Sequence, residues 1–468
     1  MLNLYYSNHL ETQKEILIHL LTRQPLADPF QSEQILVQSQ GMAQWLKLEI
    51  AQKCGIAANI SFPLPASFIW QQYHRTLPNV PQQNAFEKEK MQWHLMALIP
   101  DLLAQPDFAA LKKYLNTNEK DKQIEQTEQQ KLYQLSGKIA DLFDQYLVYR
   151  PEWIQAWEQH NDQLILSQLT TNLARNSEFS PIFSDDLQSA VGWQGQLWRA
   201  LYARVETLTQ QQQQTCWHRA SLQQQYLQVL AQQKQTDLPQ RIFIFGISAL
   251  PNVYLQTFQA MAAHCEVHLF FNNPCRYYWG DILEPSFLQQ LKLRKRKQIL
   301  NEANIRDGNT RDWNNSDWLN DKQLTQLAQL NWENDPLGYL QSGHPLLAAW
   351  GKMGRDFLYL LSQSEANEID AYAESDGDSL LVQLKNAILQ LQEIQQTAPF
   401  LLTPEDQSLT IHACHSPMRE VEILHDQLLH WFQQDPTLTP KDVVVMVADV
   451  DKYVPYIHAV FAQYQYQD

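Results

Sequence analysis

Three glutamines between residues 38 and 44 carry side chains that can recognise nucleic acid. Gln38 and Gln40 flank Ser39 in a short polar turn, and Gln44 follows one helical turn later. An amide side chain both donates and accepts hydrogen bonds, so it can pair with a base edge or a phosphate oxygen. The residue types leave a second interpretation open, in which these are ordinary polar residues of a connection between a strand and a helix.

The elements on either side of this turn favour a ligand-binding position. The preceding run, Ile35–Val37, consists of three aliphatic residues, which fit a strand covered on both faces of a sheet. From Met42 to Ile50 the apolar residues are spaced for one face of a helix. Turns that lead from a strand into a helix bind ligands in α/β folds, because free backbone N–H groups point outward there.

Four apolar segments predict one parallel sheet with a large helical insertion. The pattern is helical almost throughout from residue 85 to about residue 230, between the second and third strands. We therefore expect an α/β domain formed by residues 1–75 and 236–340, with a helical insertion at 76–235. The predicted strands are Leu2–Ser7, Ile35–Val37, Arg241–Gly246 and Glu266–Phe271.

A second α/β unit is expected over residues 341–468. It follows a polar, acidic stretch at 301–335 and would contain two strands, Ser408–Cys414 and Val443–Val447, around a helix at Arg419–Phe432. Two strands do not make a complete sheet of this kind, so we expect the chain to be the front part of a longer protein.

Composition restricts the class of protein. The formal net charge of the 468-residue chain is −16, which argues against a protein that coats DNA, although a local channel for DNA remains possible. The basic run 292–297 is either a phosphate contact or a solvated helix face. Five scattered cysteines without a CxxC pair make a zinc site or a disulfide framework improbable. Without a signal peptide or an apolar run of 18 residues, the expected location is the cytoplasm, away from the membrane.

The chain lacks the groups that a nucleotide-driven motor needs. Such a motor carries a glycine-rich loop with a lysine after its first strand, where Ser7–Thr12 has neither residue type. It also carries metal-binding carboxylates after a later strand, where Phe245–Leu250 has none. We therefore expect no ATP hydrolysis and no metal or other cofactor in this chain. A two-lobed enzyme that uses a nucleotide or a nucleotide sugar remains an alternative, as does a pure assembly scaffold.

At these residues a resemblance becomes specific. Val37–Leu46 resembles a DNA-contacting motif of superfamily 1 helicases, and the chain as a whole is very similar to the RecC family, the gamma subunit of exodeoxyribonuclease V. The resemblance covers essentially the whole chain but less than half of a family member. It is carried by the segments ILVQSQGMAQWL, GIAANISFPLPASFIW, ADLFDQYLVYRPEW, WHRA, IFGISALP, NPCRYYWGDI, GKMGRDFLYLLS, CHSPMREVEILHD and VVVMVADVD.

This resemblance implies a helicase-like subunit without ATPase residues, in the RecBCD complex that processes double-strand breaks for homologous recombination. Such a subunit holds RecB-like and RecD-like motor and nuclease subunits, which use ATP and Mg²⁺. It splits the DNA duplex and passes the 3′ single strand through a tunnel in which the hotspot Chi is recognised. The chain itself would be inactive, with the helicase and exonuclease activities in its partners.

The resemblance also implies a set of residues that line this tunnel. One departs from the family motif, because Gln40 occupies a position where the family has a small hydroxyl residue, so the hotspot sequence could differ. Taken alone, several members have other interpretations: a core position for Trp70, a solvated helix face for the acidic cluster, and a helix-end contact for Arg150. The residues are Gln38, Gln40, Gln44, Leu64, Trp70, Asp141, Leu142, Asp144, Gln145, Arg150 and Arg219.

Overall fold

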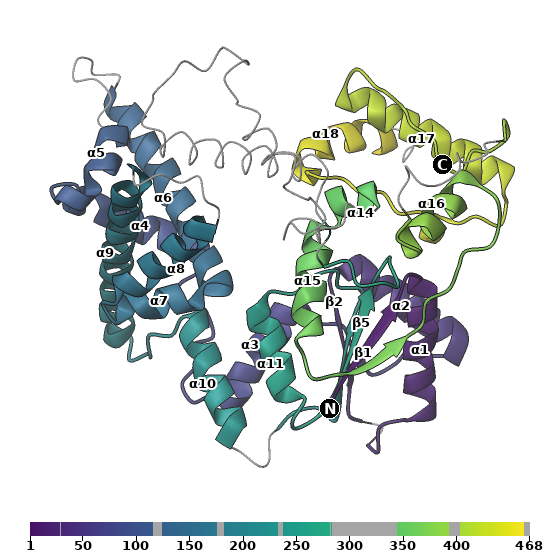
Figure 1. Ribbon diagram of the computed structural model, residues 1–468, viewed down its shortest axis with the longest axis horizontal. Coiled ribbons are helices and arrows are strands. Elements are labelled where there is room, and N and C mark those ends of the chain that lie inside the picture. Colours follow the sequence, from purple (N-terminus) through teal and green to yellow (C-terminus); the bar gives the residue numbers. More distant parts are fainter. Residues whose placement is uncertain are drawn as a thin grey trace, which may run out of the picture.

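The computed structural model describes residues 1–28, 30–115, 124–175, 182–232, 237–280, 282, 344–392 and 403–462. Its centre is a parallel six-stranded sheet with the strand order β3-β2-β4-β5-β1-β6 (Figure 1). All four predicted strands lie in this sheet, so the prediction of one parallel sheet that continues across the insertion is confirmed. The strands are β1 (Leu2–Ser7), β2 (Glu33–Val37), β3 (Ile60–Ser61), β4 (Arg241–Phe245), β5 (Glu266–Asn272) and β6 (Asn367–Asp370).

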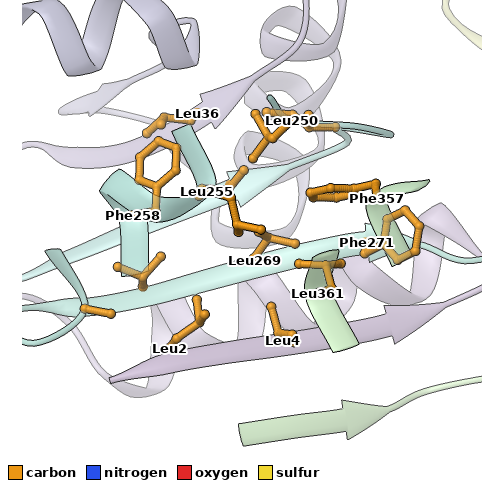
Figure 2. Packing of buried hydrophobic residues seen from close by; sticks show 14 of the residues in the cluster. Leu2, Leu4, Leu36, Leu250, Leu255, Phe258, Leu269, Phe271, Phe357 and Leu361 are labelled. Carbon is orange, nitrogen blue, oxygen red and sulfur yellow. The ribbon is translucent and has the colours of Figure 1, made fainter. Parts of the chain in front are cut away.

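Both faces of the sheet are covered because alternate strand residues point to opposite sides. Tyr5, Phe243 and Phe270 pack with helices α1 (Leu10–Arg23) and α2 (Gln40–Cys54) on one face. On the other face, Leu4, Leu269 and Phe271 meet Leu255 and Phe258 of α11 (Asn252–Met261) and Phe357 of α15 (Lys352–Ser362), as Figure 2 shows. Helix α3 (Pro65–Thr76) adds Phe68 to this second face.

The helical insertion has a hydrophobic core of its own. Buried residues between Phe86 and Ala220 form one cluster that includes Phe143, Trp157 and Trp198. Helix α10 (Arg219–Gln232) leads back from this body and packs Leu222 and Tyr226 on the sheet domain. The division of the chain into three domains at the predicted boundaries stays a prediction. The other helices of the insertion are α4 (Lys88–Leu102), α5 (Ala109–Leu115), α6 (Ile124–Tyr149), α7 (Pro151–Glu158), α8 (Asp162–Arg175) and α9 (Ile182–Gln211).

The prediction of two strands in the last part of the chain is wrong. The segments 408–414 and 443–447 make no strand ladder with any described residue, although the helix between them is present as α17 (Pro417–Gln434). Aliphatic residues favour strands locally, but a strand also needs a hydrogen-bonded neighbour. In its absence Ile411 and Met446 are 89% and 90% exposed.

One strand from the predicted second unit joins the first sheet instead. β6 pairs in parallel with β1, with Asn3 opposite Asn367 and Tyr6 opposite Asp370.

The remaining described α-helices are α14 (Pro345–Trp350), α16 (Leu380–Leu389) and α18 (Val450–Phe461). No described helix is long and apolar enough to cross a membrane. The acidic stretch 301–335 and the basic run 292–297 lie outside the described residues.

Candidate nucleic-acid interface

The loop after β1 binds the chain's own backbone at the position where a motor would bind phosphate. Asn8 Nδ2 donates to the carbonyl oxygen of Ala373 at 2.8 Å, and the Ala373 N–H donates back to Asn8 Oδ1 at 3.1 Å. His9 Nε2 lies 3.1 Å from the same carbonyl oxygen. The segment that follows β6 therefore engages the side chains of Asn8 and His9, directly before α1.

The loop after β4 is shaped by a glycine. Gly246 has a φ of +67°, a left-handed conformation that glycine adopts without steric cost. A Cβ atom at this position would lie 2.9 Å from Cε of Met42, so the start of α2 packs closely over the turn. Among the described residues, no group of three or more His, Cys, Asp or Glu side chains could hold a metal ion.

The predicted glutamines lie where β2 leads into α2. Ser39 caps the helix by accepting a hydrogen bond from the N–H of Met42 at 3.2 Å. The side chains of Gln38, Gln40 and Gln44 are exposed. The N–H of Val37 donates to the carbonyl oxygen of Pro63 at 3.2 Å, so Gln38 and Leu64 each directly follow one partner of this bond. Gln38 and Leu64 are thus neighbours at the carboxyl ends of β2 and β3, and Leu64 is 38% exposed.

Trp70 lies in helix α3. The extended conformation predicted for the Pro63–Pro65 segment holds at Leu64, with φ −71° and ψ 147°, and Pro65 then starts the helix. The Trp70 ring packs edge-on against Tyr73 and His74, with centroid distances of 6.3 and 5.8 Å. It is partly buried against the sheet core, so its side chain combines the predicted core role with an accessible surface.

Trp70 and Arg219 line one pocket of about 380 Å³, here called the Trp70 pocket. It lies between helices of the sheet domain and the helical insertion, because Val148 of α6 and Tyr254 of α11 contribute to the same wall. Figure 1 shows α3 and α11 beside the sheet, with α10 leading from them to the insertion. The structure therefore brings together two predicted residues whose positions are far apart in the sequence.

The acidic residues of α6 are held by cations from other helices. Asp144 accepts from Arg219 Nη1 at 3.1 Å, and Asp141 accepts from Lys88 Nζ at 2.6 Å. Gln145 donates to Asp141 at 3.2 Å, as the shared helix face predicts. The hydrogen bond from Lys88 lowers the pKa of Asp141 below its usual value. Leu142 lies between these groups in the sequence and is half-buried.

Arg150 lines a second pocket of about 530 Å³, here called the Arg150 pocket. Its wall includes Leu250 from the loop after β4 and Met353 from α15, and it shares Val148 and Val253 with the Trp70 pocket. Arg150 Nη1 also donates to the carbonyl oxygen of Tyr149 at 2.8 Å, which is the helix-end contact expected of this position.

The predicted residues thus form three groups. Trp70 and Arg219 share one pocket, Arg150 lines the next, and the three glutamines lie on the rim at α2. The described linings of the two pockets do not include the glutamines or Leu64. Convergence of all these residues on one channel stays a prediction.

Sequence reasoning missed Tyr254 and Lys88. Tyr254 could have been predicted as a binding residue, because it lies in the first turn of a helix that follows a parallel strand. The contact of Lys88 could not have been predicted from the sequence, since its partner Asp141 is 53 residues away.

Comparisons with known proteins show the family of the chain. The family model described as "RecC, N-terminal domain" matches residues 2–391. The RecBCD enzyme subunit RecC of Haemophilus influenzae is 48% identical over 99% of this chain, and that of Escherichia coli is 45% identical over 98%. The subunit of Mycolicibacterium smegmatis is 27% identical over 94% of the chain. The chain spans 39%, 38% and 32% of the lengths of these three relatives. The chain therefore belongs to the RecC family.

Proposed function

We propose that this chain is the DNA-guiding part of a RecBCD-type subunit, in which it directs the 3′ single strand and recognises the hotspot Chi. Its relatives are named as subunits of the RecBCD enzyme. The observation that carries the proposal is the pocket that joins Trp70 to Arg219. An aromatic face can stack on a base while a nearby guanidinium binds a phosphate or a guanine.

The fold proposed for this role is that of a superfamily 1 helicase without its ATPase residues. Residues 1–75 and 236–340 would form the first motor-like domain, residues 76–235 its helical insertion, and residues 341–468 part of a second motor-like domain. Support comes from the parallel sheet interrupted by a helical body with its own core. Further support comes from the loop after β1, whose Asn8 and His9 side chains bind Ala373.

The partners proposed for the whole protein are RecB-like and RecD-like subunits, double-stranded DNA ends and single-stranded DNA. Those subunits would use ATP and Mg²⁺ for helicase and exonuclease activity during double-strand break repair by homologous recombination. This chain would need no cofactor of its own. Its net charge of −16 fits a protein that holds DNA in a restricted path better than one that coats it.

We propose that the strand passes from the rim at Gln38, Gln40 and Gln44 to the Trp70 pocket and then to the Arg150 pocket. Amide side chains at the rim offer donors and acceptors to base edges. Arg219 and Arg150 supply positive charge at the two pockets, which share Val148 and Val253 in their linings. Because Gln40 is longer than the small hydroxyl residue of the family motif, we propose that base recognition differs at that point.

Binding of single-stranded oligonucleotides to the chain tests the proposed strand path. Trp70→Ala should weaken binding roughly ten-fold, since stacking on one base contributes about 1–3 kcal/mol. Trp350→Ala is the matched control, because Trp350 is 82% exposed and lies outside both pocket linings. Equal affinities for the wild type and both variants would contradict the proposed path and favour a pure scaffold.

A further inference from the structure

Strand β6 is an edge of the sheet, and its outer side has no strand partner among the described residues. The N–H of Ala371 donates to the carbonyl oxygen of Tyr6 at 2.8 Å, and Tyr6 lies opposite Asp370 in the parallel ladder. In this register the backbone groups of Ile369 face β1, so those of Glu368 and Asp370 point away from the sheet. Figure 2 shows β6 as the green strand next to β1. The edge therefore offers free backbone donors and acceptors to a further strand.

The same edge is strongly acidic. Six carboxylates lie between residues 365 and 378, and no lysine or arginine occurs between Arg355 and Lys385. In the described part of the chain, Arg276 is the one cation that forms an ion pair with any of the six, at 3.7 Å from Glu374. Such a surface repels phosphates and acidic chains and attracts a basic partner. The six exposed residues are Glu365, Glu368, Asp370, Glu374, Asp376 and Asp378.

An open hollow of about 800 Å³ adjoins the amino end of β6. Glu365 and Asn367 line it from the segment that enters β6, and Ala262 and Ala263 line it from the end of α11. Small apolar side chains beside one carboxylate suit the aliphatic stem and the terminal cation of a lysine or an arginine. The edge thus has space for a side chain of a paired strand as well as hydrogen-bonding groups for its backbone.

We propose that the β6 edge binds an extended, basic segment of a partner protein, which adds a strand to the sheet. Backbone hydrogen bonds to Glu368 and Asp370 hold the segment, and a lysine or arginine beside Glu365 gives selectivity. The sheet ends in β3 at one edge and β6 at the other, and the glutamines lie near β2 and β3. The inference therefore goes beyond the proposed function and does not depend on it.

The test measures binding of a short fluorescent peptide of alternating lysine and valine residues to the full chain by fluorescence anisotropy. A control peptide has the same side chains but carries N-methyl groups on its backbone nitrogens, so it cannot donate to a strand edge. The unmodified peptide should bind roughly ten-fold more tightly than the methylated one, because backbone hydrogen bonds are lost. Equal affinities would mean that charge alone attracts the peptide and would overturn the proposal.

Two variants at one position separate backbone pairing from charge. Asp370→Asn removes the carboxylate but keeps the outward N–H, so it should weaken peptide binding only about two-fold. Asp370→Pro also removes the N–H and should weaken binding roughly ten-fold, while the pairing with β1 is kept because this N–H points outward. Glu89→Gln is the control for charge, because Glu89 is exposed on α4 of the helical insertion and its loss should leave the affinity unchanged.

Hydrogen exchange provides a second measurement that does not depend on the folding of Asp370→Pro. In the wild-type chain the peptide should slow exchange at the amides of Glu368 and Asp370 and leave the amides of β4 unchanged. Unchanged exchange at Glu368 and Asp370, or equal affinities of the two folded Asp370 variants, would overturn the proposal. Self-association of the chain that Asp370→Pro abolishes would overturn it in favour of a second copy at this edge.

Discussion

Arg219 Nη1 lies 3.1 Å from Oδ1 of Asp144, so the first residue of α10 is paired with a carboxylate near the end of α6. The two side chains are 39% and 30% exposed, which places the pair at an accessible part of the molecule. The contact joins the helical insertion to the helix that leads back to the sheet. It also fixes the guanidinium beside Trp70 in the pocket proposed to hold the strand.

Breaking this pair should affect DNA binding more than folding. A partly exposed ion pair contributes about 0.2–1 kcal/mol, so Asp144→Ala and Arg219→Ala should each lower the free energy of unfolding by no more than that. Arg219→Ala should also weaken oligonucleotide binding roughly five-fold or more. Denaturant titrations and binding curves for both single variants and the double variant give the coupling energy. A loss of several kcal/mol in stability would mean that the pair is mainly structural.

The contact between Lys88 and Asp141 predicts that substitution of Lys88 changes the pKa of the Asp141 carboxyl group. The Lys88 hydrogen bond lowers the pKa of Asp141, so the carboxylate stabilises the fold above its unfolded pKa of about 3.9. That contribution is lost as the pH falls through the lowered pKa of the folded state. Lys88→Gln should therefore raise the pKa of Asp141 toward its ordinary value, as measured by carboxyl-carbon NMR. An unchanged titration midpoint would show that the contact is absent in solution.

Gly246→Ala tests the turn after β4. Because Gly246 has a φ of +67°, alanine there should lower the free energy of unfolding by about 1–3 kcal/mol. Gly41→Ala in the first turn of α2 is the control, since its Cβ would meet only Ser39 Oγ at 3.8 Å and alanine favours the helix. Thermal or denaturant unfolding measures both variants. If they had equal stability, the left-handed turn would be in doubt.

The hydrogen bonds between Asn8 and Ala373 predict that this chain does not bind ATP. Titration calorimetry with Mg²⁺ and ATP should give no heat of binding, because the loop after β1 has no glycine and no lysine and its Asn8 side chain is bonded to Ala373. Asn8→Ala removes both bonds and should speed hydrogen exchange at the amide of Ala373 without creating ATP binding. Saturable binding of ATP that Asn8→Ala abolishes would contradict the prediction.

The buried strands were predicted well from the sequence. Helices pack on both faces of the sheet, so these strands consist of continuous apolar runs that are easy to recognise. It did not predict β6, whose residues Asn367–Asp370 are all exposed at the edge of the sheet and carry no apolar pattern. It was wrong at 408–414 and 443–447, where aliphatic composition gave a local strand signal without a partner strand. Strand pairing is a non-local property that periodicity in one segment does not contain.

The membership of the candidate site stays a prediction, and its side-chain contacts were predicted only in part. Helical spacing correctly placed Asp141 and Gln145 together on one face, where they form a hydrogen bond. The cations that hold the two aspartates come from α4 and α10, and no local pattern in the sequence predicts either pairing.

The most direct test of hotspot recognition at the glutamine rim uses Gln44→Ala in the assembled complex with the proposed motor and nuclease partners. Gln44 is exposed on α2, so its loss should leave the fold intact. Two rates are measured on the same DNA, the rate of duplex unwinding and the frequency of the response at the hotspot. We expect near-normal unwinding with a clearly weakened response at the hotspot. A collapse of unwinding, or an unchanged response at the hotspot, would contradict it.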